Sequence, residues 1–198
     1  TLGKINTKTK LESYFGKFYG SAKASLTLDL PIVFPVSTNI YFTLNRWDYF
    51  RSFATFFEDV KPSFLVQNEI YAGFQVCHPI SNTIKNIFDG RAFKLDDSYY
   101  QSEKFTNTDT TDVTNFNGAS FSWSIIKNSL NRKQFASGGH YFKFKARYVR
   151  GEEYSRSGST SAVPYNVFKN HSWINLGLNY QSFLIDKSHF HLGLQGQM

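Results

Sequence analysis

The sequence predicts an all-β protein, an antiparallel up-and-down sheet of the kind that forms a transmembrane β-barrel. Three observations lead to this prediction. Apolar and polar residues alternate along most of the chain, aromatic residues make up 18% of it, with 21 Phe and 12 Tyr, and short and long connections take turns between the alternating segments. Because successive side chains of a strand point to opposite faces, this alternation predicts a sheet with one apolar face and one polar face.

The clearest alternating segment lies between His140 and Val149. One face of this segment is apolar and aromatic, and the other face is cationic. The apolar residues are Phe142, Phe144, Ala146 and Tyr148, and the cations are Lys143, Lys145 and Arg147. Three long cations in a row suit water or a polar lumen, so the pattern favours the wall of an outer-membrane β-barrel.

Seven further segments alternate in the same way, although the one that begins at Ile84 is weak and contains Gly90. The predicted strands cover residues 23–30, 38–45, 63–76, 84–96, 119–125, 141–148, 174–181 and 189–195. Eight strands describe either a complete small barrel or half of a sixteen-stranded one.

The connections between these segments are of two kinds. Short ones are predicted at residues 34–37, 78–82, 129–138 and 185–187, and long polar ones at residues 50–62, 90–118 and 151–170. Short and long connections alternate, as they do in outer-membrane barrels with short periplasmic turns and long extracellular loops. Trp173 and Tyr180, near the two ends of one strand, are expected at the two membrane interfaces.

Composition excludes several other classes. The formal net charge is +7, but the bases are scattered rather than clustered, which argues against a nucleic-acid-binding protein. A single cysteine, Cys77, excludes an internal disulfide framework and offers no zinc site. The sequence has no run of 18 apolar residues, so only a barrel could place this chain in a bilayer.

Signals for catalysis are weak. The stretch from Gly118 to Ser122 lacks the last glycine of a nucleophile elbow and lies on a predicted strand. The pair Glu152 and Glu153, beside two arginines, is expected to form an ion network at the base of a loop rather than a catalytic pair. We therefore predict no catalytic residues in this chain.

Signals for metal or cofactor binding are equally weak. His189 and His191 have a chelating spacing on one strand, but two hydrated histidines explain them as well. Four aspartates of one predicted loop lack the spacing of a calcium-binding loop; they are Asp96, Asp97, Asp109 and Asp112. The tripeptide Asp89-Gly90-Arg91 is interpreted as a turn. We predict no metal site and no cofactor.

Several ordered strings resemble a known family. Residues 44–50, 56–63 and 67–69 look like the C-terminal barrel of bacterial patatin-like phospholipases. Residues 128–139 are similar to a strand-turn-strand of the Omp85-type surface-antigen barrels, and residues 146–153, 158–159 and 171–173 continue this likeness in order. The likeness spans residues 20 to 195 and contains no catalytic signature. The family's lid-loop motif is not met, because Val149-Arg150-Gly151 is followed by Glu152.

The resemblance implies a sixteen-stranded barrel in a Gram-negative outer membrane, following a periplasmic patatin hydrolase domain and short POTRA-like modules. Residues 1–198 would then be an incomplete barrel segment that anchors a lipid hydrolase, whose elbow serine and aspartate match nothing in this chain. Outer-membrane lipid and the remaining strands of the barrel are the expected partners, with a homo-oligomer or other outer-membrane proteins left open. The alternatives are an Omp85-type protein-insertion or secretion barrel and a complete small eight-stranded barrel.

Overall fold

The computed structural model describes residues 5–31, 35–48, 64–102, 104–106, 108–132, 136–187 and 190–198. These residues form one antiparallel sheet in which every strand pairs with the next strand of the chain. The nine strands are β1 (Asn6–Phe15), β2 (Tyr19–Leu30), β3 (Val36–Asp48), β4 (Phe64–Pro79), β5 (Ile84–Tyr99), β6 (Asp112–Asn128), β7 (His140–Arg156), β8 (Asn166–Lys187) and β9 (Phe190–Gln197). The predicted all-β, up-and-down topology is confirmed.

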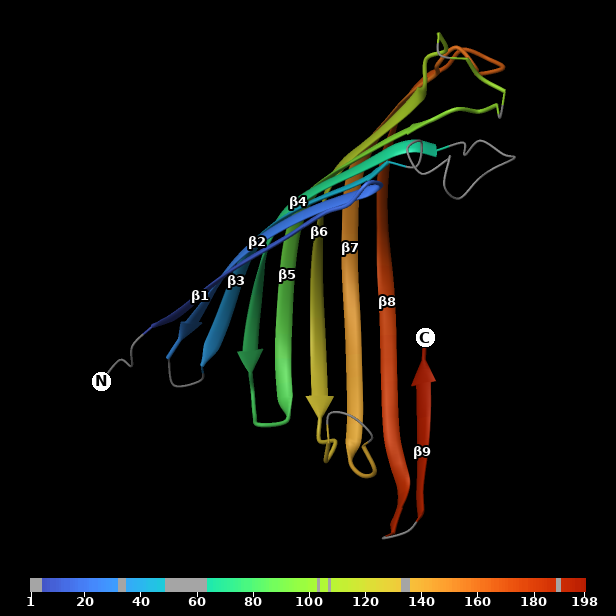
Figure 1. The fold of residues 1–198 in the computed structure, drawn as a ribbon. Helices are drawn as coiled ribbons and strands as arrows, with labels where there is room; N and C mark the ends of the chain where they lie inside the picture. Colours follow the sequence, from blue (N-terminus) through green and yellow to red (C-terminus); the bar gives the residue numbers. More distant parts are fainter. Residues whose placement is uncertain are drawn as a thin grey trace.

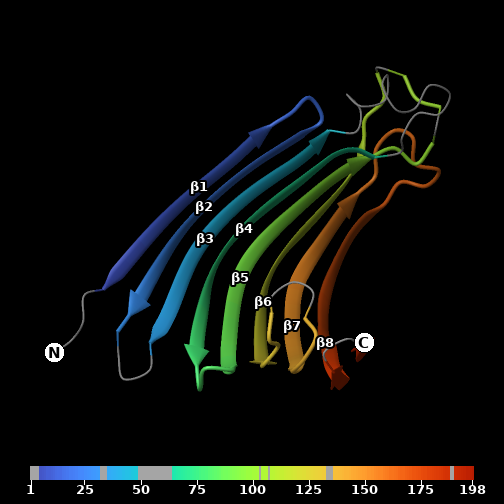
Figure 2. The same cartoon turned by 60° about the horizontal axis from the view of Figure 1, so that its bottom comes forward.

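The sheet is a single curved and twisted layer, with β1 and β9 at its two edges (Figures 1 and 2). Among the described residues, β1 and β9 do not pair with each other, so the sheet is not closed. No helix of the described part is long and apolar enough to span a membrane.

The strands are longer than the sequence analysis predicted. Residues 90–99 and 112–118 belong to β5 and β6, so the connection predicted at 90–118 spans only residues 100–111. The connection predicted at 151–170 likewise shortens to 157–165. Toward these strand ends the polarity of the two faces is exchanged, although the backbone ladder continues. The paired Lys94 and Asn117 lie on the apolar face, while Phe93 and Phe116 lie on the polar face. The long connection at 50–62 lies outside the described residues.

Strand β1 was not among the eight predicted strands. All of its residues are exposed, and its pattern of Lys and Thr residues gives no apolar periodicity over its first half. It is nevertheless paired with β2 along its whole length, from Asn6 opposite Asp29 to Phe15 opposite Gly20.

Direct cross-strand pairing sorts the side chains onto two faces. One row across the sheet is largely apolar: Ile40, Phe74, Gly90, Phe121, Tyr148 and Ile174. The adjacent row is polar: Asn39, Gln75, Asp89, Ser122, Arg147 and Asn175. We call the two sides of the sheet the apolar face and the polar face.

Burial is inverted relative to a water-soluble domain. The polar face holds most of the buried side chains of the strands, namely Tyr41, Thr43, Asp89, Asp112, Ser120, Ser122, Ser124, Val149 and Ser155, whereas Ser182 is buried on the apolar side. The apolar face is exposed, for instance 52% at Ile40, 69% at Ile174 and 62% at Leu176. The accessible surface of 13863 Å² also exceeds the roughly 9,600 Å² expected for a compact monomer of this mass. Among the described residues, the buried hydrophobic side chains are only Tyr41, Tyr100 and Val149, so that part of the sheet has no continuous apolar core and its less exposed side is the polar face.

Aromatic rings lie over glycines of neighbouring strands. A Cβ added at Gly73 would lie 2.7 Å from the ring of Tyr41, and a Cβ at Gly90 would lie 2.8 Å from the ring of Phe74. Phe93 covers Gly118 and Phe116 covers Gly151 in the same way. Glycine is needed at these places because any side chain would occupy the position of the ring.

Candidate functional site on the polar face

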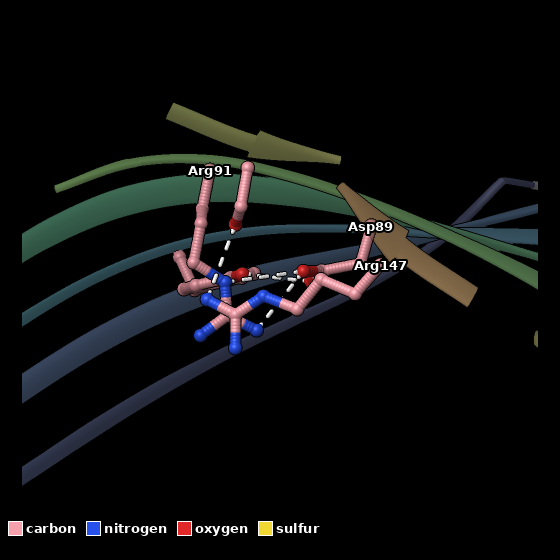
Figure 3. Close-up of polar contacts among 5 residues, drawn as sticks. Asp89, Arg91 and Arg147 are labelled. Carbon is pink, nitrogen blue, oxygen red and sulfur yellow. Dashed lines mark hydrogen bonds and ion pairs between the residues drawn. The ribbon is translucent and has the colours of Figure 1, made fainter. Parts of the chain in front are cut away.

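The polar face carries a buried cluster near its centre, which we call the Asp89 cluster: Tyr41, Asp89, Arg91, Ser120 and Arg147. Asp89 accepts hydrogen bonds from the Tyr41 hydroxyl (2.7 Å) and from Nε and Nη2 of Arg91 (3.2 and 3.0 Å). Asp89 is 7% exposed, so the paired arginine compensates a carboxylate that is largely removed from water. Figure 3 shows the side chains of Asp89, Arg91 and Arg147 converging on one place.

The cluster corrects the interpretation of Asp89-Gly90-Arg91 as a turn. These residues lie in the middle of β5, and Asp89 and Arg91 share the polar face because they are two positions apart. Gly90 points to the apolar face, where the ring of Phe74 covers it. The Asp-Gly pair resembles a turn locally, but here the glycine accommodates a ring from the neighbouring strand.

Three cations follow one another along β7 on the same face. We call Lys143, Lys145 and Arg147 the cationic strip. Arg147 donates a hydrogen bond from Nη2 to Ser120 (3.4 Å), while its Nε is buried without a hydrogen-bond partner among the described residues. Neither lysine has a carboxylate within ion-pair distance in that part of the chain. The positive charge of the strip is therefore uncompensated by direct contact.

A small cavity of about 140 Å³ lies beside the strip. Its polar lining comes from Lys143, Lys145, Asn179 and Gln197, and Gly177 lies opposite Lys145 in the register. A Cβ added at Gly177 would have no neighbour closer than 4.0 Å, so the missing side chain leaves open space. Leu178 and Met198 complete the described lining, which includes no Asp or Glu side chain.

A second cluster ties together the two connections at the other end of the strands. Asp112, at the start of β6, is fully buried and accepts hydrogen bonds from four donor groups. These donors are Gln101 Nε2 (2.6 Å), the Gly158 amide (2.6 Å), the Ser161 hydroxyl (2.8 Å) and the Tyr165 hydroxyl (3.0 Å). We call this group the Asp112 cluster.

Tyr165 lies in the connection between β7 and β8, and its ionisation is strongly opposed. Its hydroxyl contacts the Tyr99 hydroxyl at 3.2 Å and Asp112 at 3.0 Å. The hydrogen bond with Tyr99, burial and the nearby carboxylate together raise the pKa of Tyr165 well above its usual range.

Asp109 links the same two connections on the surface. It accepts hydrogen bonds from the Thr106 amide (2.7 Å), the Thr106 hydroxyl (2.9 Å) and the Ser159 hydroxyl (2.8 Å). These hydrogen bonds, led by the backbone N–H of Thr106, lower the pKa of Asp109.

The four aspartates considered for a calcium loop are not brought together. Asp96 points to the apolar face and Asp97 to the polar face, while Asp109 and Asp112 are engaged by hydroxyl and amide donors of the connections. Among the described residues, no three His, Cys, Asp or Glu side chains form a group that could hold a metal ion. His189 lies outside the described residues, and nothing is established for the side chain of His191.

The pair Glu152 and Glu153 is split between the faces. Glu153 lies on the polar face and contacts Ser155 (3.0 Å) and His171 Nε2 (2.8 Å), whereas Glu152 points to the opposite side, beside Asn170. Among the described residues, the Glu153–His171 contact is the only contact of these carboxylates within ion-pair distance, and both residues lie within paired strands rather than at the base of a loop.

Trp173, expected at a lipid interface, lies on the polar face. It is opposite Val149, and its ring stacks on Phe116 with a centroid distance of 6.0 Å. Tyr180, seven positions later, is on the apolar face as expected, because an odd spacing places two residues on opposite faces.

No protein-family model, no curated protein and no solved structure matches this chain. The features that bear on function are therefore the two faces of the sheet and the resemblance seen in the sequence.

Proposed function

We propose that this chain is part of the wall of a bacterial outer-membrane β-barrel, and that the barrel anchors a patatin-like lipid hydrolase whose catalytic domain lies outside this chain. The apolar face contacts outer-membrane lipid, and the polar face lines an aqueous interior. The wall itself supplies no catalytic residues.

The proposed position in a membrane is supported by one observation, the height of the exposed apolar band on β6, β7 and β8. On each of these strands, four consecutive outward positions are apolar or aromatic. They are Ala119, Phe121, Trp123 and Ile125; Phe142, Phe144, Ala146 and Tyr148; Ile174, Leu176, Leu178 and Tyr180.

Polar outward residues bound this band on both sides. They are Asn117 and Lys127 on β6, Arg150 and His140 on β7, and Ser172 and Ser182 on β8, in each case ten positions apart. Ten residues span about 33 Å along a strand. With a strand tilt of about 40°, the band is about 25 Å tall, which matches the hydrocarbon thickness that outer-membrane barrels present.

The polar boundary also crosses the strands obliquely. Asn68 of β4 is opposite Asp96, yet the first polar outward residue of β5 is Lys94, two positions nearer the band. Asn117 of β6 is opposite Glu152, yet the boundary on β7 has already reached Arg150. A level membrane surface produces such a stagger when the strands are tilted.

The open edges require further pairing in this proposal. In a bilayer, unpaired backbone groups of β1 and β9 are costly, so the barrel closes through its remaining strands. The sixteen-stranded barrel implied by the sequence resemblance supplies them. If the protein forms homo-oligomers or associates with other outer-membrane proteins, we expect the contacts to form through the long connections and not through these edges.

Spin labelling tests the lipid-facing assignment. Leu176→Cys and Asn175→Cys, each in a Cys77→Ser background, place a nitroxide on opposite faces of β8 in liposomes. We expect the label at 176 to collide with oxygen in the lipid, and the label at 175 to collide with a water-soluble nickel complex. Equal accessibility at the two sites would refute the membrane wall.

The anchoring part is tested by the intact mass of the protein from an outer-membrane fraction, with peptides mapped beyond residues 1 and 198. A mass several-fold above 22.8 kDa with an elbow-serine peptide supports the hydrolase. POTRA-like modules without that serine favour the Omp85-type insertion or secretion barrel. A mass near 22.8 kDa contradicts both and favours a small complete barrel.

A further inference from the structure

We infer that the cationic strip of β7, together with the cavity beside it, binds small anions from the aqueous side of the sheet. This inference rests on the proposed function in one respect: the polar face must be open to water. The ligand class is small inorganic anions, such as chloride and phosphate.

The cationic strip carries three like charges, and the residues that face it are uncharged. Consecutive positions of the strip are about 6.6 Å apart along the strand, so three like charges repel one another unless an anion lies between them. The facing residues on both sides carry no charge. They are Ser122, Ser124 and Ile126 on β6, and Asn175, Gly177 and Asn179 on β8.

The one nearby carboxylate is already engaged. Asp89 lies in the same row as Arg147, with Ser122 between them. It accepts three hydrogen bonds from Arg91 and the Tyr41 hydroxyl, and among the described residues its ion pair is with Arg91 and not with the strip. Arg147 retains a buried Nε–H without an acceptor among the described residues, a group for which an anion provides a partner.

Most of the other described acids of the polar face are separated from the strip. Glu69 and Glu153 lie in one row toward the connections 100–111 and 157–165, and Asp97 and Asp112 lie beyond them. A row containing Phe93, Gly118 and Gly151 lies between these acids and the Asp89 cluster. Asp29 of β2 lies in the row of Lys145 but five strands away from it, and Glu12 lies on the edge strand β1. On β4 to β7, the described polar face is thus acidic near these connections and cationic toward the short turns.

The cavity offers a place for the ligand. Lys143, Lys145, Asn179 and Gln197 line a volume of about 140 Å³ together with Leu178 and Met198, and Gly177 has no side chain to fill it. Ammonium and amide N–H groups are donors, and anions are acceptors. Lipid head groups contact the opposite face in the proposed barrel, so the aqueous phase is the expected source.

The test measures ³⁵Cl line broadening by the full protein in neutral detergent, and its reversal by inorganic phosphate. The variant Lys143→Gln/Lys145→Gln/Arg147→Gln removes the strip. The control Lys94→Gln/Lys127→Gln/Arg150→Gln removes the same charge from the apolar side of the sheet. We expect the strip variant to require about tenfold more phosphate for half reversal, and the control to behave like the unmodified protein.

Gly177→Leu provides a charge-neutral second test, because it fills the cavity without changing the strip. It is expected to weaken phosphate competition while the circular dichroism spectrum stays that of a β-sheet. Unchanged broadening in the strip variant and in Gly177→Leu, or an equal loss in the control, would overturn the inference. Failure of the spin-label pattern with intact anion binding would instead contradict the membrane wall alone.

Discussion

The hydroxyl of Tyr41 in β3 donates a 2.7 Å hydrogen bond to Asp89 in β5, although β4 lies between the two strands. The contact is possible because Gly73 of β4 lies opposite both Tyr41 and Arg91, and its missing side chain lets the tyrosine ring cross the strand. A glycine on one strand thus determines a polar contact between its two neighbours.

Gly73→Ala should destabilise the sheet by about 1–3 kcal/mol, the usual cost of overpacking. The new Cβ would lie 2.7 Å from the Tyr41 ring and 2.7 Å from the Gly90 carbonyl oxygen. Urea unfolding of the protein refolded into lipid measures the effect. Gly196→Ala is the matched control, because nothing lies within 4 Å of its added Cβ. Equal unfolding midpoints for the two variants would show that the ring does not need the glycine.

Leu176→Lys should lower the free energy of unfolding by about 2–4 kcal/mol, because this position is near the middle of the proposed lipid-facing band. Phe144→Lys should behave similarly, since Phe144 is on the same face, opposite Leu178. Lysine at Asn175, on the polar face, and Lys145→Gln are the controls and should change stability little. The free energy of unfolding from liposomes is the measurement. Similar costs for both faces would contradict the lipid-facing assignment.

The surface link between the two connections should be lost in acid. The pKa of Asp109 is lowered in the folded state by its hydrogen bonds to Thr106 and Ser159. The stabilisation that Asp109 provides is therefore fully present above the pKa of an unfolded aspartate, about 3.9. It disappears as the pH falls through the lower pKa of Asp109 in the folded state. Hydrogen exchange of the Thr106 amide between pH 6 and pH 2.5 should report this loss. Asp109→Asn should show weaker protection and no such step; a step of equal size in the variant would contradict the assignment.

The Asp112 cluster should weaken in strong alkali. The pKa of Tyr165 is raised in the folded state. The stabilisation that its hydroxyl provides is therefore complete below the ordinary tyrosine pKa of about 10 and is lost as the pH rises through the higher pKa of the folded state. Ultraviolet titration of the wild type minus Tyr165→Phe should isolate a late-ionising phenol among the 12 tyrosines. A difference spectrum that rises at pH 10 would show that the hydrogen bonds to Tyr99 and Asp112 do not persist in solution.

The strand pattern was largely predictable because each side chain on a strand is assigned to a face by its position alone. The segment 141–148 was predicted with the correct faces, and its outward Phe144 and inward Lys145 lie where alternation places them. The prediction failed where the alternation of apolar and polar residues is absent or reversed. It missed β1, it began the connection after β5 at Gly90, and it ended β7 early, since Lys94, Asp96 and Glu152 are polar on the apolar side.

The candidate site was less predictable, because its contacts join residues far apart in the chain. Tyr41 and Asp89 are 48 positions apart, and Asp112 and Tyr165 are 53 apart. No local spacing signals either pair, and Asp89-Gly90-Arg91 resembled a turn until its strand neighbours were known. The cations of β7 were visible in the sequence, but their lack of carboxylate partners depends on the residues that the register places opposite them.

By itself, the sequence determined that this protein forms antiparallel strands with one apolar and one polar face, because the period of two is a property of the extended backbone. Only the tertiary structure decided which face is sheltered, which glycines lie under aromatic rings, and which charges are paired. Those features depend on the register and curvature of the sheet, since they arise from contacts between strands that no single segment contains.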